Sequence, residues 1–189
     1  MPGGPSFIKL SNLLKHEKLH TVCEEAKCPN IGECWNSGTA TFMILGDICT
    51  RHCRYCAVTS GRPLTLDLEE PARLAITVER LNLSHCVITS VNRDDLTDGG
   101  SYIFAECIRQ IRRRLPSCQV EVLVPDFQGD LKAIETVMQA SPDVLNHNIE
   151  TVRRIFHRVR PLGGYDQSLQ ILSYVKHMYP DAVTKSGLM

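Results

Sequence analysis

Six of the nine cysteines form two closely spaced triplets, namely Cys23, Cys28 and Cys34, and then Cys49, Cys53 and Cys56. Four and then five residues separate the cysteines of the first triplet, and three and then two separate those of the second. An iron–sulfur cluster needs several thiolates that converge on one inorganic core, and close spacing lets a single loop supply them. Because each triplet would leave one iron of a four-iron cluster without a thiolate, the pattern favours two clusters that take part in chemistry.

Two other uses of clustered cysteines fit this sequence less well. Structural zinc normally takes four ligands in paired C-x2-C knuckles, a pattern that the second triplet does not follow. Disulfides belong mainly to oxidising compartments, and residues 1–10 have neither the apolar core of a secretory signal nor the composition of a transit peptide. We therefore expect metal-ligating cysteines in a cytoplasmic protein, or in an organelle matrix if the source is a eukaryote.

Bulk composition argues against two classes of partner. The 21 Lys and Arg residues balance the 21 Asp and Glu residues, so nothing in the net charge points to nucleic acid or to an anionic membrane. No apolar stretch approaches the roughly 18 residues that a membrane span requires. The 189 residues are enough for one domain with a hydrophobic core.

Apolar runs of strand length alternate with helical patterns from residue 40 onward. The expected strands are 41–45, 86–89, 120–124, 143–145 and 182–186. The expected helices are 69–82, 103–111, 131–138, 152–159 and 166–179. This alternation predicts a parallel sheet with right-handed crossovers. We expect residues 1–39 to form an extension that contains a short helix near residues 10–14 and then the loop with the first triplet.

Polar residues follow each expected strand, as the reacting groups of (β/α) barrels do. Asp47 and the second triplet follow the first strand, residues 92–95 follow the second, Asp126 follows the third, and residues 146–150 follow the fourth. The predicted fold class is therefore α/β, with a partial (β/α) barrel of about five parallel strands at 40–189. Since the sequence ends just after the fifth strand, we expect a part of a fold with an unpaired sheet edge.

The second triplet, with Tyr55 just before its last cysteine, resembles the signature of radical S-adenosylmethionine enzymes. The first triplet, in the segment CEEAKCPNIGECW, resembles the auxiliary-cluster motif of the lipoyl synthase family. The segments NRDDL at 92–96 and HNIET at 147–151 also match that family. The resemblance extends from about residue 10 to the end of the chain, and the double triplet is its most specific part.

The resemblance implies a defined chemistry and set of cofactors. A lipoyl synthase inserts two sulfur atoms at C6 and C8 of a protein-bound octanoyl chain, and two molecules of S-adenosylmethionine each give one hydrogen-abstracting radical. Two [4Fe-4S] clusters are implied: Cys49, Cys53 and Cys56 hold the one that binds S-adenosylmethionine. The implied auxiliary cluster, on the first triplet, is the source of sulfur.

The implied partners are octanoylated carrier proteins, which are the glycine cleavage H protein and the E2 lipoyl domains. An electron donor such as ferredoxin or flavodoxin and an iron–sulfur carrier protein are also implied.

The residues expected to bind the cofactor are Tyr55, Asn92, Arg93, Asn148, Glu150, Arg160 and Lys185. Ribose hydroxyls are the expected target of Asn148 and Glu150, for which the alternative is a cap of the helix after residue 151. Arg93, Arg160 and Lys185 are expected to be carboxylate partners.

Some nearby residues are expected to be structural. We expect His147 to be structural, Cys86 and Cys107 to be small buried hydrophobes, and Cys118 to be a surface thiol in a turn.

Two departures from the family pattern keep an alternative function open. The Arg-Ser-Ser-Tyr motif, whose serine completes the auxiliary cluster in the family, does not occur in this sequence. The glycine-rich segment that follows the fifth strand in the family is not present before Met189. The alternative is a truncated, non-catalytic fragment that binds an iron–sulfur cluster or zinc. A different radical enzyme with an electron-transfer cluster is disfavoured by the C-x4-C-x5-C spacing of the first triplet.

Overall fold

The computed structural model describes residue 17, residues 19–22 and residues 30–189. Cys23, Cys28 and the helix expected near residues 10–14 lie outside the described residues. Cys34 is described, and it lies on the short helix α3 (Ile31–Asn36). The predicted division at residues 39 and 40 stays a prediction, although strand β1 (His20–Thr21), from the extension, pairs with β2 (Thr39–Ile44) in the main sheet.

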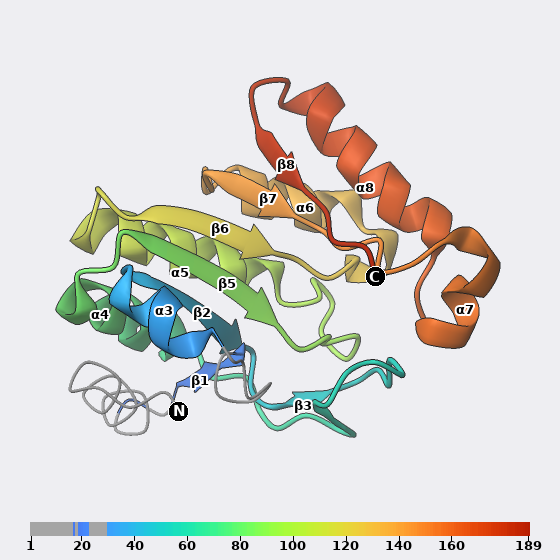
Figure 1. Ribbon diagram of the computed structural model, residues 1–189, viewed down its shortest axis with the longest axis horizontal. Helices are drawn as coiled ribbons and strands as arrows, with labels where there is room; N and C mark the ends of the chain where they lie inside the picture. Colours follow the sequence, from blue (N-terminus) through green and yellow to red (C-terminus); the bar gives the residue numbers. More distant parts are fainter. Residues whose placement is uncertain (1–16, 18, 23–29) are drawn as a thin grey trace.

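A six-stranded sheet in the order β1-β2-β5-β6-β7-β8 forms the centre of the fold (Figure 1). Its strands are β1 (His20–Thr21), β2 (Thr39–Ile44), β5 (His85–Ser90), β6 (Gln119–Leu123), β7 (Val144–Asn146) and β8 (Val183–Lys185). The last five pair in parallel, as predicted, and the short β1 pairs antiparallel with β2. Chain order equals spatial order along the parallel part, which is the order that successive βα units of a barrel wall produce.

Helices cover one face of this sheet and follow each other in the order of the strands (Figure 1). The longer ones are α4 (Glu70–Leu81), α5 (Ser101–Arg114), α6 (Leu131–Met138) and α8 (Tyr165–Met178). Their positions agree with the expected helices. In α4, Leu74 and Val78 are fully buried and stand one turn apart, so the apolar stripe read from the sequence is the stripe that packs on the sheet.

The strands turn different residues to their two faces. Cys86 and Ile88 of β5 are fully buried against the helices, whereas the alternate residue Thr89 lines a cavity on the opposite face. Across the sheet, Thr89 stands in register with Met43 on one side and Leu123 on the other. All three line the same cavity, so side chains from three neighbouring strands, on one face of the sheet, contribute to one site.

The helix expected at 152–159 is in part wrong. The chain forms a 3-10 turn at Arg153–Ile155 and then one turn of α-helix, α7, at Phe156–Val159. Ile155 has φ −115° and ψ 1°, which interrupts regular helix between the two. The apolar spacing of Val152, Ile155 and Phe156 cannot distinguish these two kinds of turn, because both bring residues three apart to one side.

Cys118 is buried, so its expected place as a surface thiol is wrong. The side chain of Arg112 folds over the turn and donates a hydrogen bond of 3.0 Å to the Cys118 carbonyl, and the residue is 0 % exposed. Cys86 and Cys107 are also 0 % exposed, which confirms them as buried residues.

The sequence did not indicate several short elements. These are β1, α3 (Ile31–Asn36), β3 (Ile48–Cys49), β4 (Thr59–Ser60) and the 3-10 turn η1 (Phe127–Gly129). In the part of the chain that the structure describes, no helix is both long and apolar enough to cross a membrane.

Candidate cluster and cofactor site

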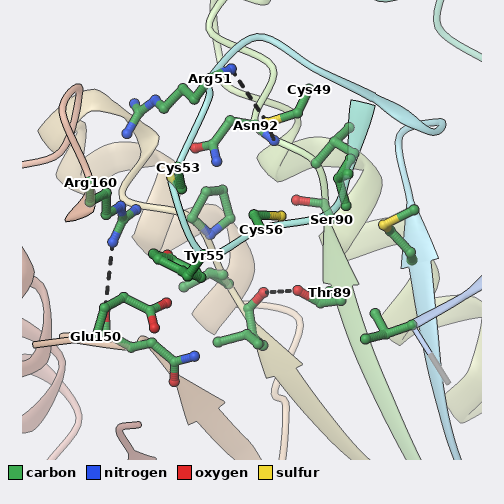
Figure 2. A pocket seen from close by; sticks show the side chains of 18 of the residues that line it. Cys49, Arg51, Cys53, Tyr55, Cys56, Thr89, Ser90, Asn92, Glu150 and Arg160 are labelled. Atoms are coloured by element: carbon green, nitrogen blue, oxygen red, sulfur yellow. Dashed lines mark hydrogen bonds between the residues drawn. The ribbon is translucent and has the colours of Figure 1, made fainter. Parts of the chain in front are cut away.

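A cavity of about 300 Å³ opens at the carboxyl ends of β5, β6 and β7. Cys49, Cys53 and Cys56 all line it, together with residues that follow those strands (Figure 2). This is the edge at which (β/α) barrels hold their reacting groups. The predicted placement of the second triplet at that edge agrees with the structure.

A small parallel ladder closes the loop that carries the three cysteines. Strand β3 pairs with β4 through Ile48 opposite Thr59 and Cys49 opposite Ser60, and the Gly61 N–H donates to the Cys49 carbonyl at 2.9 Å. Within the loop, the Cys56 N–H donates to the Cys53 carbonyl at 3.1 Å. These bonds fold residues 50–58 back on themselves, so three thiols from one short segment reach one cavity.

The sulfur of Cys49 already accepts two backbone hydrogen bonds. The donors are the N–H of Arg51 at 3.4 Å and the N–H of Asn92 at 3.3 Å. These two hydrogen bonds hold the sulfur in a fixed position at the cavity wall. Asn92 therefore contacts the loop through its backbone, and its side chain also lines the cavity.

The chemistry of the donor set fits an iron–sulfur cluster. Among the described residues, no three His, Cys, Asp or Glu side chains are already gathered as a site for a metal ion; the three thiols are instead spread along one cavity wall. Burial raises the pKa of the Cys53 thiol, and the positive charge of Arg160 acts in the opposite direction. The hydroxyl oxygen of Ser90, buried and beside the cavity, has no hydrogen-bond partner in the described part of the chain. A bound polar group would satisfy it.

Arg51 lies between the first two cysteines of the loop and anchors it to the strand ends. Its Nε and Nη2 donate to the two carboxylate oxygens of Asp94 at 2.7 Å each, and its Nη1 donates to Asp126 at 2.7 Å. Burial by itself would lower the pKa of Arg51, but the bonds with Asp94 and Asp126 outweigh it and raise the pKa. The side chain is therefore a fixed cation.

Arg160 joins the same network from the end of α7. Its Nη2 lies 3.3 Å from Asp126, and its Nη1 donates to the Asn148 carbonyl at 3.5 Å. Arg160 is 5 % exposed and Asp126 is fully buried. Burial acts to raise the pKa of Asp126, yet the hydrogen bonds and charge of Arg51 hold that pKa below its ordinary value.

Asn148 and Glu150 both line the cavity, as the sequence predicted. Glu150 has φ +68°, a left-handed conformation that residues other than glycine seldom adopt. Its N–H donates to the Gly187 carbonyl at 3.0 Å, and its carbonyl accepts from the Met189 N–H at 2.8 Å. The Asn148 side-chain oxygen accepts the Gly187 N–H at 2.9 Å. The segment after β8 therefore holds both residues in place.

Tyr55 lies on the same side of the cavity as Glu150 and Arg160 (Figure 2). Burial raises the pKa of its hydroxyl, and the negative charge of Glu150 raises that pKa further. Tyr55 is therefore a neutral hydrogen-bonding group at the cavity wall.

The helix-cap alternative for Asn148 and Glu150 is wrong. The 3-10 turn that begins at Arg153 has no side-chain hydrogen bond at its N-terminus, and neither has α7.

His147 is 1 % exposed and bonds the Val124 carbonyl at 2.9 Å and the Ser168 hydroxyl at 3.1 Å. These contacts fit the structural role expected for it.

Two of the proposed carboxylate partners do not reach the cavity. Arg93 pairs with Asp95 at 2.9 Å and donates to the Leu45 carbonyl at 3.2 Å. Lys185 pairs with Glu121 at 2.9 Å. Neither belongs to the cavity wall, whereas Arg160 does.

Sequence reasoning missed the pairing of Arg51 with Asp94 and Asp126. The sequence did place all three residues near the expected site, because both aspartates follow strands of the sheet and Arg51 lies between two candidate ligands. Nothing in their spacing shows that they meet.

A family model described as the radical SAM superfamily matches residues 43–189. The chain belongs to the radical SAM superfamily. Radical SAM chains use a [4Fe-4S] cluster and S-adenosylmethionine, so these are the cofactors of this member. The match includes the three-cysteine loop, the end of β2 and the four parallel strands that follow it.

Curated relatives of this radical SAM chain carry the name lipoyl synthase. The protein from Rubrobacter xylanophilus is 58 % identical over 189 residues, which are 100 % of this chain and 59 % of that relative. The protein from Symbiobacterium thermophilum is 60 % identical over 183 residues, covering 97 % of this chain and 57 % of the relative. The chain thus spans about three fifths of the length of these relatives.

A solved structure supports the radical SAM fold. The crystal structure of methylornithine synthase (PylB) matches with a TM-score of 0.57 and 12 % identity, and the match covers 96 % of this chain and 54 % of that one. At this identity the likeness concerns the fold alone.

Proposed function

We propose that this radical SAM chain carries the catalytic core of a lipoyl synthase, which inserts two sulfur atoms at C6 and C8 of a protein-bound octanoyl chain. The observation that carries the proposal is the 55–60 % identity to proteins of that name along essentially the whole chain. The cavity lined by Cys49, Cys53 and Cys56 supports it.

The chain's own residues would bind and orient the cofactors in this proposal. Cys49, Cys53 and Cys56 would hold the cluster, which supplies the electron that splits S-adenosylmethionine into methionine and a 5′-deoxyadenosyl radical. Asn148 and Glu150 stand where they could accept hydrogen bonds from ribose hydroxyls, because both line the cavity and are braced by the segment after β8.

The remaining cofactor-binding residues have unequal support. Arg160, at the cavity wall, is the best placed partner for the carboxylate of S-adenosylmethionine. Tyr55 and Asn92 contribute to the same wall. Arg93 and Lys185 would contact S-adenosylmethionine only after they give up their ion pairs, Arg93 with Asp95 and Lys185 with Glu121.

The first triplet would hold the auxiliary cluster that donates sulfur. Cys34 is half-buried and packs against the core beside the buried Ile31 and Trp35 of α3, so at least one of the three proposed ligands has a fixed support. Cys23 and Cys28 enter the proposal from the sequence motif alone.

The partners follow from this chemistry. The substrate would be the octanoylated glycine cleavage H protein or an E2 lipoyl domain. The cluster would be loaded by an iron–sulfur carrier protein and reduced by ferredoxin or flavodoxin. The cytoplasm is the proposed compartment.

The decisive experiment uses the anaerobically reconstituted protein with octanoylated H protein, S-adenosylmethionine and dithionite. We expect 5′-deoxyadenosine, and an H protein whose mass shows two added sulfur atoms. Binding has its own readout, since S-adenosylmethionine should change the electron paramagnetic resonance signal of the reduced cluster. 5′-Deoxyadenosine without sulfur insertion would restrict the proposal to radical generation, and zinc in place of iron would support the non-catalytic alternative.

A further inference from the structure

Exposed basic residues border the outer side of the cysteine loop. They are His52, Arg54, Arg154, His157 and Arg158, here called the basic rim. The N–H of Arg54 donates to the Val159 carbonyl at 3.0 Å, which joins the loop to the end of α7. Figure 1 shows α7 and the loop after β3 at the same end of the molecule. The two segments that carry the rim therefore adjoin each other, although they are distant in the sequence.

The charge of the rim is not neutralised within the described part of the chain. None of the side chains of Arg54, Arg154 and Arg158 takes part in an ion pair there. The neighbouring acidic residue Asp166 is occupied, because Arg153 bonds both of its oxygens at 2.5 Å. Since the whole chain has a net charge of +0, this is a local excess of positive charge.

The rim is also close to the proposed cluster ligands. Arg54 directly follows Cys53, so their Cα atoms are only about 3.8 Å apart. Cys56 is exposed and lies two residues further along the loop. A protein seated on the rim would be separated from the cluster by little more than this loop.

We propose that the basic rim is the docking surface for a small acidic protein that carries single electrons. The inference rests on the proposed function, which needs one electron for each molecule of S-adenosylmethionine that is split. In the step at the rim, the partner loses one electron and the cluster gains it, and no bond is made or broken. Electron-transfer encounters have small interfaces, and complementary charge on such a surface speeds association.

Charge reversal at the rim tests the proposal with flavodoxin hydroquinone as the probe. In the double variant Arg154→Glu/Arg158→Glu of the reconstituted protein, reduction of the cluster by flavodoxin should slow about tenfold at low ionic strength. The difference should shrink as NaCl is added, because salt screens exposed charges. Dithionite needs no docking surface and should reduce the variant's cluster to the same extent as that of the unaltered protein.

A matched control separates the rim from net charge. Arg113→Glu/Lys132→Glu makes the same change in charge on exposed positions of α5 and α6, and it should leave the rate with flavodoxin near that of the unaltered protein. Calorimetric titration with oxidised flavodoxin gives a readout that does not depend on the cluster, and only the rim variant should bind more weakly.

Two results would overturn the inference. One is an equal effect of the rim and control variants on flavodoxin binding and on the rate. The other is weakened binding of octanoylated H protein by the rim variant while flavodoxin is unaffected, which would make the rim a substrate surface. A failure of the proposed function looks different, since the dithionite reaction would then fail in the unaltered protein too.

Discussion

Arg51 and Asp126 stand 75 residues apart in the sequence and form an ion pair of 2.7 Å whose side chains are 3 % and 0 % exposed. The pair fixes the cysteine loop to the end of β6. Because Arg160 approaches the same carboxylate oxygen at 3.3 Å, one aspartate holds together the cluster loop and the end of α7. Without the negative charge of Asp126, the buried guanidinium groups of Arg51 and Arg160 would lose part of the charge that balances them.

Asp126→Asn should therefore destabilise the protein strongly. Loss of one partner of a buried pair costs about 3–5 kcal/mol, and urea unfolding should show it. The matched control is Asp166→Asn, because Asp166 is 75 % exposed and pairs with the exposed Arg153; it should change stability little. Equal stability of both variants would show that the buried network is not important for the fold.

Replacement of Cys49, Cys53 and Cys56 by alanine should abolish the paramagnetic response to S-adenosylmethionine. The physical reason is that no other thiol lines this cavity in the described part of the chain. Cys86→Ala is the control, since that thiol is fully buried against the helices. A response that survives the triple replacement would place the cluster elsewhere.

The triple variant also isolates the proposed auxiliary site. With only Cys23, Cys28 and Cys34 as ligands, we expect a cluster that mild chelation removes faster than it removes the auxiliary cluster of a complete lipoyl synthase, because without the completing serine water or added thiol must occupy the fourth corner. Iron counting before and after chelation measures it. A chelation-resistant count near four irons would mean that another group of the chain completes the site.

Gly100→Ala should destabilise the protein through the packing behind the cluster loop. Gly100 has φ +88°, and an added Cβ would lie 2.3 Å from Cδ1 of Leu45, a residue that is 3 % exposed. Overpacking of this kind costs about 1–3 kcal/mol. At Gly61 the nearest atom would be 3.4 Å away, so Gly61→Ala should be tolerated and serves as the control in thermal unfolding.

His147 should make stability depend on pH. Burial lowers its pKa from 6.5 to about 4, so the folded protein holds the neutral ring while the unfolded chain takes up a proton below about pH 6.5. Its contribution is complete above pH 6.5 and falls by about 1.4 kcal/mol for each pH unit below that, until about pH 4. The nearest charged groups, Asp126, Arg160 and Arg51, act in opposing directions.

Urea unfolding between pH 8 and pH 5 checks this, with His147→Gln as the variant and the exposed His52→Gln as its control. The loss of stability on acidification should be smaller in His147→Gln than in His52→Gln. Identical slopes would show that the ring of His147 takes up its proton at the same pH in the folded and in the unfolded protein.

The sequence by itself determined the parts of the protein that depend on local pattern. The apolar periodicity of segments such as 70–81 and 119–123 fixed the helices and strands, because each must bury one stripe or face. The position of Cys49, Cys53 and Cys56 directly after the first parallel strand placed them at the functional edge of the sheet. The parallel order followed from the strand–helix alternation.

Only the tertiary structure decided which distant charges meet. Arg93 and Lys185 were read as cofactor residues, yet they pair with Asp95 and Glu121 away from the cavity, while Arg51 and Asp126 hold the loop that carries the cluster ligands. Spacing along a chain sets which residues share a strand or a turn. Contacts between loops that follow different strands depend instead on the curvature of the sheet and the path of each loop, which no local pattern in the sequence records.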